Sequence, residues 1–163
     1  MIIDYTFFQD GLLMVDGAMA LATPSPTNKA IAGRIESYIN QYEPEYLSKL
    51  LGEELYNDFL SNEDSERWEA FKKLIVKEDG LFKTSPIANY VYFFLVRDSQ
   101  SKATVNGVKS DGDENLVSAG AKLVSAWNNM VFENRKIYMW LCNKFHNVPT
   151  EPELLETINS LGV

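Results

Sequence analysis

The chain has 163 residues, of which 45% are hydrophobic and 12% aromatic, so it can bury a core without a metal or a disulfide. Its net charge of −8 argues against binding nucleic acid by counterion release, and its one cysteine excludes an internal disulfide and fits a reducing compartment. The longest apolar run, residues 91–96, is far short of the roughly 20 residues that cross a bilayer. We therefore expect a cytoplasmic protein with no membrane span.

The negative charge is concentrated in the first part of the chain. Residues 1–60 carry nine acidic and three basic side chains, a net of −6, whereas residues 61–163 carry fourteen and twelve, a net of −2. Solubility alone accounts for this asymmetry. The alternative is an acidic face that meets a basic partner or keeps DNA from adhering.

The first 26 residues predict an extended arm or small hairpin, followed by a loop. Asp-Gly pairs at residues 10–11 and 16–17 are strong turn signals. Two prolines within residues 22–28 block regular structure there.

Three short helices are expected between residues 28 and 60. Thr27 or Asn28 can cap the first of them. Pro44 suits the first turn of the second helix, where its missing N–H has no partner, and Gly52 suits the left-handed residue that ends it. A polar break at residues 62–65 precedes a further helix, whose apolar face consists of Trp68, Phe71, Leu74 and Ile75.

The middle of the chain predicts a buried helix between two loops. Lys77–Lys83 is expected to form a loop, after which Ser85 and Pro86 begin a helix as its cap and first residue. This helix is apolar nearly all round, as is typical of the centre of a core. Residues 99–116 predict a long polar loop or a hairpin, with weak strand candidates at Ala103–Val105 and Val108.

The last third predicts a long amphipathic helix from about Val117 to about Phe145, roughly 40 Å in length. A capping-box pattern at Thr150–Glu153 predicts a final short helix that ends at Gly162. We expect one all-α domain over residues 1–163: a helical bundle around the buried Ser85–Asp98 helix, with at most a minor β-hairpin or extended arm.

No residue pattern predicts catalysis or cofactor binding. His146 is the only histidine and has no orienting partner nearby in sequence, and Cys142 is interpreted as a small buried hydrophobe. Glu53, Glu54 and Asp58 fit helix-start and surface charge better than an acid–base set. Phosphate-loop, dinucleotide-binding and zinc patterns do not occur in the sequence. We expect no enzyme, no catalytic residue and no cofactor.

The loop that contains Ser110–Asn115 offers one candidate cation site. Its carboxylates, on Asp111, Asp113 and Glu114, could bind a hard cation through oxygen ligands. The loop lacks the alternation of acids and the final glutamate of an EF-hand. A solvated loop therefore fits better, and no metal site is expected. Trp68, Trp127 and Trp140 lie on helical stripes and are expected to anchor the core or an interface.

Three blocks of sequence carry a resemblance to a known group of proteins: Tyr42–Leu60, Ser85–Asp98 and Leu123–Tyr138, with a polar loop between the second and the third. They resemble small helical proteins encoded beside capsid genes in tailed phages and prophages of gut anaerobes, which in turn resemble head–tail connector, or adaptor, proteins. The resemblance covers residues 27–145. It implies a helical bundle that assembles as a ring below the portal, with a loop or terminus that reaches neighbouring subunits.

The function expected from this resemblance is that of a non-enzymatic structural or assembly protein of the virion. Its partners would be portal and tail proteins and further copies of the chain, with no sequence-specific binding of nucleic acid. The alternative is a soluble, acidic, helical protein-binding module with a regulatory role. The candidate interface residues lie in the N-terminal arm and the polar loop: Phe7, Phe8, Leu12, Leu13, Val105, Val108, Asp111, Asp113 and Glu114.

Overall fold

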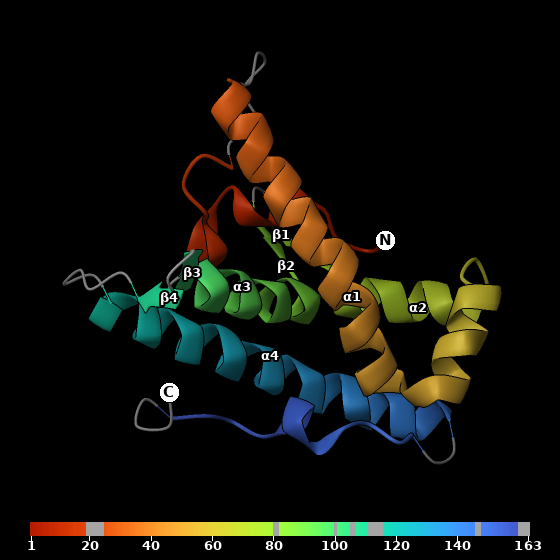
Figure 1. The fold of residues 1–163 in the computed structure, drawn as a ribbon. Coiled ribbons are helices and arrows are strands. Elements are labelled where there is room, and N and C mark those ends of the chain that lie inside the picture. Colours follow the sequence, from red (N-terminus) through yellow and green to blue (C-terminus); the bar gives the residue numbers. More distant parts are fainter. Residues whose placement is uncertain are drawn as a thin grey trace.

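The computed structural model describes residues 1–18, 25–79, 82–99, 101–104, 107–110, 116–145 and 148–159, with the backbone alone at 101–104, 107–110 and 116–119. Most of this part of the chain is helical, which confirms the all-α class. The α-helices are α1 (Pro26–Ser61), α2 (Glu66–Ile75), α3 (Pro86–Ser99) and α4 (Leu116–Lys144) (Figure 1).

The central helix of the bundle is α3, as predicted. The Ser85 hydroxyl accepts the N–H of Ile87 at 3.2 Å, which satisfies one of the free donors at the start of the helix. Residues 86–92 and Leu95 are buried. Helix α4 packs along α3, and α1 crosses the pair (Figure 1).

Helix α1 continues through Pro44 and bends at Gly52. The prediction that Pro44 begins a helix is wrong, because it lies inside α1. A proline at this position cannot donate to the carbonyl of residue 40, and residue 40 is exposed to water that can solvate that carbonyl. Gly52 has a φ of 73° and interrupts the helical geometry, as expected. The cap at the start of α1 is Ser25, whose hydroxyl accepts from the N–H of Asn28 at 3.2 Å, rather than Thr27 or Asn28.

Two antiparallel hairpins lie beside the helices. Strands β1 (Lys77–Asp79) and β2 (Phe82–Thr84) pair where the sequence predicts a loop. The residues of β2 are all exposed, so the hairpin has no apolar alternation that the sequence could reveal. Strands β3 (Ser101–Thr104) and β4 (Gly107–Ser110) pair where a hairpin was one of the two expectations.

The N-terminal segment, residues 1–18, is neither an extended arm nor a β-hairpin. It forms two 3₁₀ turns, Tyr5–Phe8 and Gly11–Leu13. Asp4 caps the first turn by accepting the N–H of Thr6 at 2.9 Å. The segment packs into the core through Ile3, Phe7, Phe8 and Leu13, which are all buried. The chain does turn at the two Asp-Gly pairs, where Gly11 and Gly17 have φ angles of 75° and 80°, but burial against the helices replaces the strands expected on either side.

The C-terminal segment, residues 148–159, contains a single 3₁₀ turn, Pro152–Leu155, and not the predicted helix. The capping box does not form, because the Thr150 hydroxyl donates to the carbonyl of Leu50 at 2.7 Å instead. The segment runs back along α4 (Figure 1), and side chains of α4 bind its carbonyl groups. Those carbonyls would bond to N–H groups of the same segment if it were a helix.

Candidate protein-interaction surface

An apolar groove of about 500 Å³ lies between the N-terminal segment, the β1–β2 hairpin and α4. Its floor includes the buried side chains of Phe7, Leu13 and Ile75. Its rim carries three large apolar side chains that remain mostly in water: Leu12 at 81%, Phe82 at 54% and Phe132 at 60% exposure. Large apolar side chains gathered at one exposed site are typical of a surface that binds another protein.

The rim residues come from three different elements, which the fold brings together. Gly11, with a φ of 75°, makes the turn that presents Leu12. A Cβ atom on Gly11 would contact the ring of Phe82 at 3.5 Å, so the turn lies directly against β2. Phe132 lies on an exposed position of α4.

Ion pairs hold the edges of the groove. Lys77 of β1 pairs with Glu133 of α4, and Lys83 of β2 lies 3.4 Å from Glu78 of β1. Burial alone would raise the pKa of Glu133, but hydrogen bonds from Lys136 and Lys77 outweigh it and lower that pKa. The charges at the edge therefore compensate one another, and the groove offers a binding partner mainly apolar surface.

A buried carboxylate of α1 anchors the start of the N-terminal segment. The two oxygens of Glu43 accept the N–H groups of Ile2 at 2.8 Å and Ile3 at 3.0 Å. Burial raises the pKa of Glu43, and the two N–H donors oppose that rise. The sequence places Glu43 in a predicted helix but gives no sign of its hydrogen-bond partners, because they lie about 40 residues away.

The predicted interface residues lie in different surroundings in the structure. Phe8 is fully buried in the core, whereas Phe7 and Leu13 are almost fully buried in the floor of the groove. Leu12 is exposed and forms part of the groove rim. The backbone of Val108 lies in β4, and its side chain is among those not described. The other predicted positions, Val105, Asp111, Asp113 and Glu114, lie outside the described residues.

The tryptophans and Asp58 have structural roles. Trp68 and Trp127 are buried, and Trp140 packs partly buried against the core, as expected for anchors. Asp58 accepts the indole N–H of Trp68 at 2.8 Å and also pairs with Arg67. It therefore ties α1 to α2, a role that local sequence does not reveal.

The remaining candidates for chemistry are Cys142 and His146. Cys142 is exposed, so the prediction of a small buried hydrophobe is wrong. His146 lies outside the described residues.

A polar cluster on α1 fixes the C-terminal segment. Lys49 lies 2.8 Å from Glu45, 2.7 Å from Glu153 and 3.2 Å from the hydroxyl of Tyr90. Burial favours the neutral amine of Lys49, but the bonds to Glu153 and Glu45 outweigh it and raise its pKa. An amine held in its charged form is poorly suited to act as a base or nucleophile, so the cluster serves as an attachment.

Among the described residues, no group of three or more acidic, histidine or cysteine side chains is placed to hold a metal ion. None of the helices in the described ranges is long and apolar enough to cross a membrane. Comparison with known proteins gave no match: no protein-family model, no curated protein and no solved structure matches the chain significantly.

Proposed function

We propose that this protein is a non-enzymatic structural protein of virion assembly, resembling a head–tail connector that forms a ring between portal and tail. The observation that carries the proposal is the apolar groove with Leu12, Phe82 and Phe132 on its rim. A single copy leaves this surface in water, and full burial would stabilise each side chain by at most about 1.5–3 kcal/mol, in proportion to its exposed fraction. Further copies of the chain and the portal and tail proteins are its proposed partners.

The arrangement of the three resemblance blocks supports this assignment. The first block spans the bend of α1 at Gly52, the second coincides with α3, and the third lies within α4. These elements form the packed body of the bundle (Figure 1). The β3–β4 hairpin lies between α3 and α4 at one end of that body, where an element reaching a neighbour would be placed.

The charge on α1 is also consistent with a channel through which DNA moves. Glu36, Glu53 and Glu54 are exposed on this helix. Exposed carboxylates repel phosphate groups and so discourage adhesion of DNA to a ring lining.

The first test is the state of assembly of the full chain. Native mass spectrometry and light scattering would follow the protein over a range of concentrations, alone and with a portal protein encoded beside its gene. We expect oligomers, favoured by the portal. A strict monomer in every condition would contradict the proposal, and capture of a basic protein by that monomer would favour the regulatory alternative.

A matched pair of substitutions tests the groove. Phe132→Ser removes an exposed rim residue, and Met139→Ser removes a residue that is 68% exposed on the same helix but does not line the groove. Because both side chains are in water, both variants should fold. We expect Phe132→Ser to weaken assembly by roughly tenfold or more, as for an interface anchor, and Met139→Ser to leave it unchanged. If the two variants assemble equally well, the groove is not part of the interface.

A further inference from the structure

The apolar groove contains a polar atom that the described residues leave without a hydrogen-bond partner. Asn89 of α3 lines the groove, and only 9% of its surface is exposed. Its amide N–H donates to the carbonyl of Ser85 at 3.1 Å, which identifies the other amide atom as the oxygen. No hydrogen bond among the described residues uses this oxygen. A buried acceptor without a donor is unfavourable, so it favours an occupant that brings a donor into the groove.

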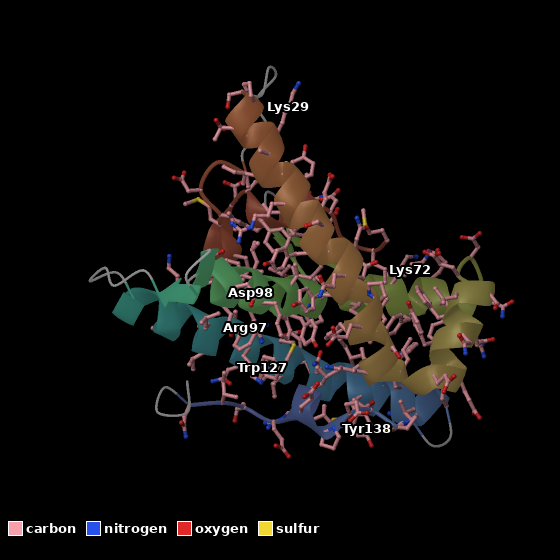
Figure 2. All side chains as sticks on the ribbon, in the orientation of Figure 1. Lys29, Lys72, Arg97, Asp98, Trp127 and Tyr138 are labelled. Atoms are coloured by element: carbon pink, nitrogen blue, oxygen red, sulfur yellow. The ribbon has the colours of Figure 1, made fainter. Side chains whose placement is uncertain are left out.

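The occupant that suits this atom has an apolar body with one donor on it. The groove of about 500 Å³ lies within the range of roughly 300–1,000 Å³ that is typical of ligand-binding pockets. The head group of a lysine would lose its hydration among the apolar side chains. Tryptophan and tyrosine combine a large ring with an N–H or O–H, and both are enriched among interface anchors. The chain itself binds an indole in this way: Trp127, labelled in Figure 2, is buried and donates its N–H to the carbonyl of Glu156 at 2.9 Å.

The rim of the groove also carries an acidic side chain that is not paired. The rim cation Lys77 pairs with Glu133. The rim cation Lys83 lies 3.4 Å from Glu78. The carboxylate of Asp10 lines the same groove, and no ion pair or hydrogen bond among the described residues uses it. A basic group next to the aromatic anchor would pair with Asp10, whereas an acidic group there would be repelled.

The charge of the whole chain favours a basic partner over a second copy. The net charge is −8, and residues 1–60, which include the N-terminal segment that lines the groove, contribute −6 of it. Two copies that met through this groove would bring like charges together. A basic segment would instead be attracted to it.

We infer that the groove binds a short segment of a partner protein in which a tryptophan or tyrosine stands next to an arginine or lysine. The aromatic ring fills the apolar groove and donates to the amide oxygen of Asn89, and the basic side chain pairs with Asp10. This inference rests on the proposed function, because it specifies the chemistry of the segment that a portal or tail protein presents to this surface.

A displayed library of random peptides, each about seven residues long, tests the inference with the full chain. Peptides are selected on the wild-type protein, and those that also bind the Phe132→Ser variant are removed, because they bind outside the groove. The Met139→Ser variant is the control and should keep the selected peptides. We expect the selected peptides to be enriched in tryptophan or tyrosine beside arginine or lysine. Selected peptides that lack this pair, or the absence of any groove-dependent peptide, would overturn the inference.

Two comparisons with the strongest selected peptide test its contacts. Replacing its tryptophan with benzothienylalanine, which has the same shape but no N–H, or its tyrosine with phenylalanine, should weaken binding roughly three- to tenfold. Asp10→Asn should weaken binding roughly two- to fivefold, and less at high salt. Asp16→Asn, at an exposed position of the N-terminal segment that does not line the groove, should leave binding unchanged. Equal binding of the two peptides, or equal effects of the two aspartate variants, would overturn the inference.

The same peptide separates this inference from the proposed function. Displacement of the portal protein by the peptide would support both. If the peptide instead dissociates oligomers that the chain forms alone, a second copy fills the groove, and the inference is wrong while the proposed function stands. Complexes with the portal that the peptide leaves intact would also overturn the inference alone. Selection of aromatic–basic peptides by a chain that stays monomeric in every condition would support the specificity of the groove and overturn the proposed function.

Discussion

The two ends of the described chain pack on the same helical bundle in opposite chemical ways. The N-terminal segment is bound through its N–H groups, which the carboxylate of Glu43 accepts. The C-terminal segment is bound largely through its carbonyl groups, which Trp127, Asn128 and other side chains of α4 recognise as donors. In both cases, a helix side chain takes the place of a partner strand.

The two segments also differ in how many apolar side chains they bury. The N-terminal segment buries four large apolar side chains, Ile3, Phe7, Phe8 and Leu13, whereas the C-terminal segment buries only Val148 and Leu154 to a comparable degree. Each fully buried side chain of this size contributes about 1.5–3 kcal/mol. The N-terminal segment is therefore part of the core, whereas the C-terminal segment is held mainly through its main chain. Substitutions in each segment can test this difference.

The largest expected effect is that of Phe8→Ala. The Phe8 side chain is fully buried in the core, so its removal should lower the free energy of unfolding by roughly 3–5 kcal/mol, measured by urea denaturation. Leu12→Ala, four residues later on the exposed rim, should change stability by no more than about 0.5 kcal/mol. A similar small effect at both positions would show that the N-terminal segment is not part of the core.

An intermediate effect is expected for Asn134→Ala. Asn134 is buried on α4, where its side chain accepts a hydrogen bond from the hydroxyl of Tyr46 and donates one to the carbonyl of Leu154. The substitution leaves both of these buried groups without that partner. We expect a loss of roughly 2–3 kcal/mol together with faster hydrogen exchange in the C-terminal segment. Asn129→Ala, at an exposed position of the same helix, serves as the control. A loss of stability with unchanged exchange in that segment would count against the proposed attachment.

The smallest expected effect is that of Glu43→Gln, which weakens the bonds to the N–H groups of Ile2 and Ile3 and should cost about 1 kcal/mol. The stability lost in this substitution should depend on pH. Because burial raises the pKa of Glu43 in the folded protein, the stability that this residue contributes is present below its ordinary pKa of 4.5 and decreases as pH rises through the raised value.

The cost of Glu43→Gln should therefore be greater near pH 4.5 than at neutral pH. Denaturation of both proteins across this range gives the difference. An advantage of the wild-type chain that grows with pH would mean that the pKa of Glu43 is lowered by folding.

Helices were predicted well where the signals that make them are local. The apolar residues after Ser85, together with the cap and the proline at the first position, define α3 as the central helix. Gly52 interrupts α1 where its positive φ was expected. Pro44 misled the prediction, because a proline can also occupy a helix interior where water solvates the carbonyl that it leaves unpaired.

The interaction surface was predicted less well, because its residues meet only in three dimensions. Leu12 was identified as a candidate, but Phe82 and Phe132 of the groove rim were not. Phe82 lies in a hairpin without apolar alternation, and Phe132 is one apolar residue among many on a long helix. Helical periodicity places Phe132 off the apolar face of α4, but it cannot show that Leu12 and Phe82 lie beside it.

The sequence by itself determined the helical class, the central helix and the long α4, because periodicity, caps and breaks act within a few residues. Only the tertiary structure decided the conformation of the two terminal segments. Their main-chain groups bond to side chains about 20 to 40 residues away, such as Glu43 and Asn134. Competition between those distant partners and the bonds within a helix or hairpin is settled by burial, which local sequence does not encode.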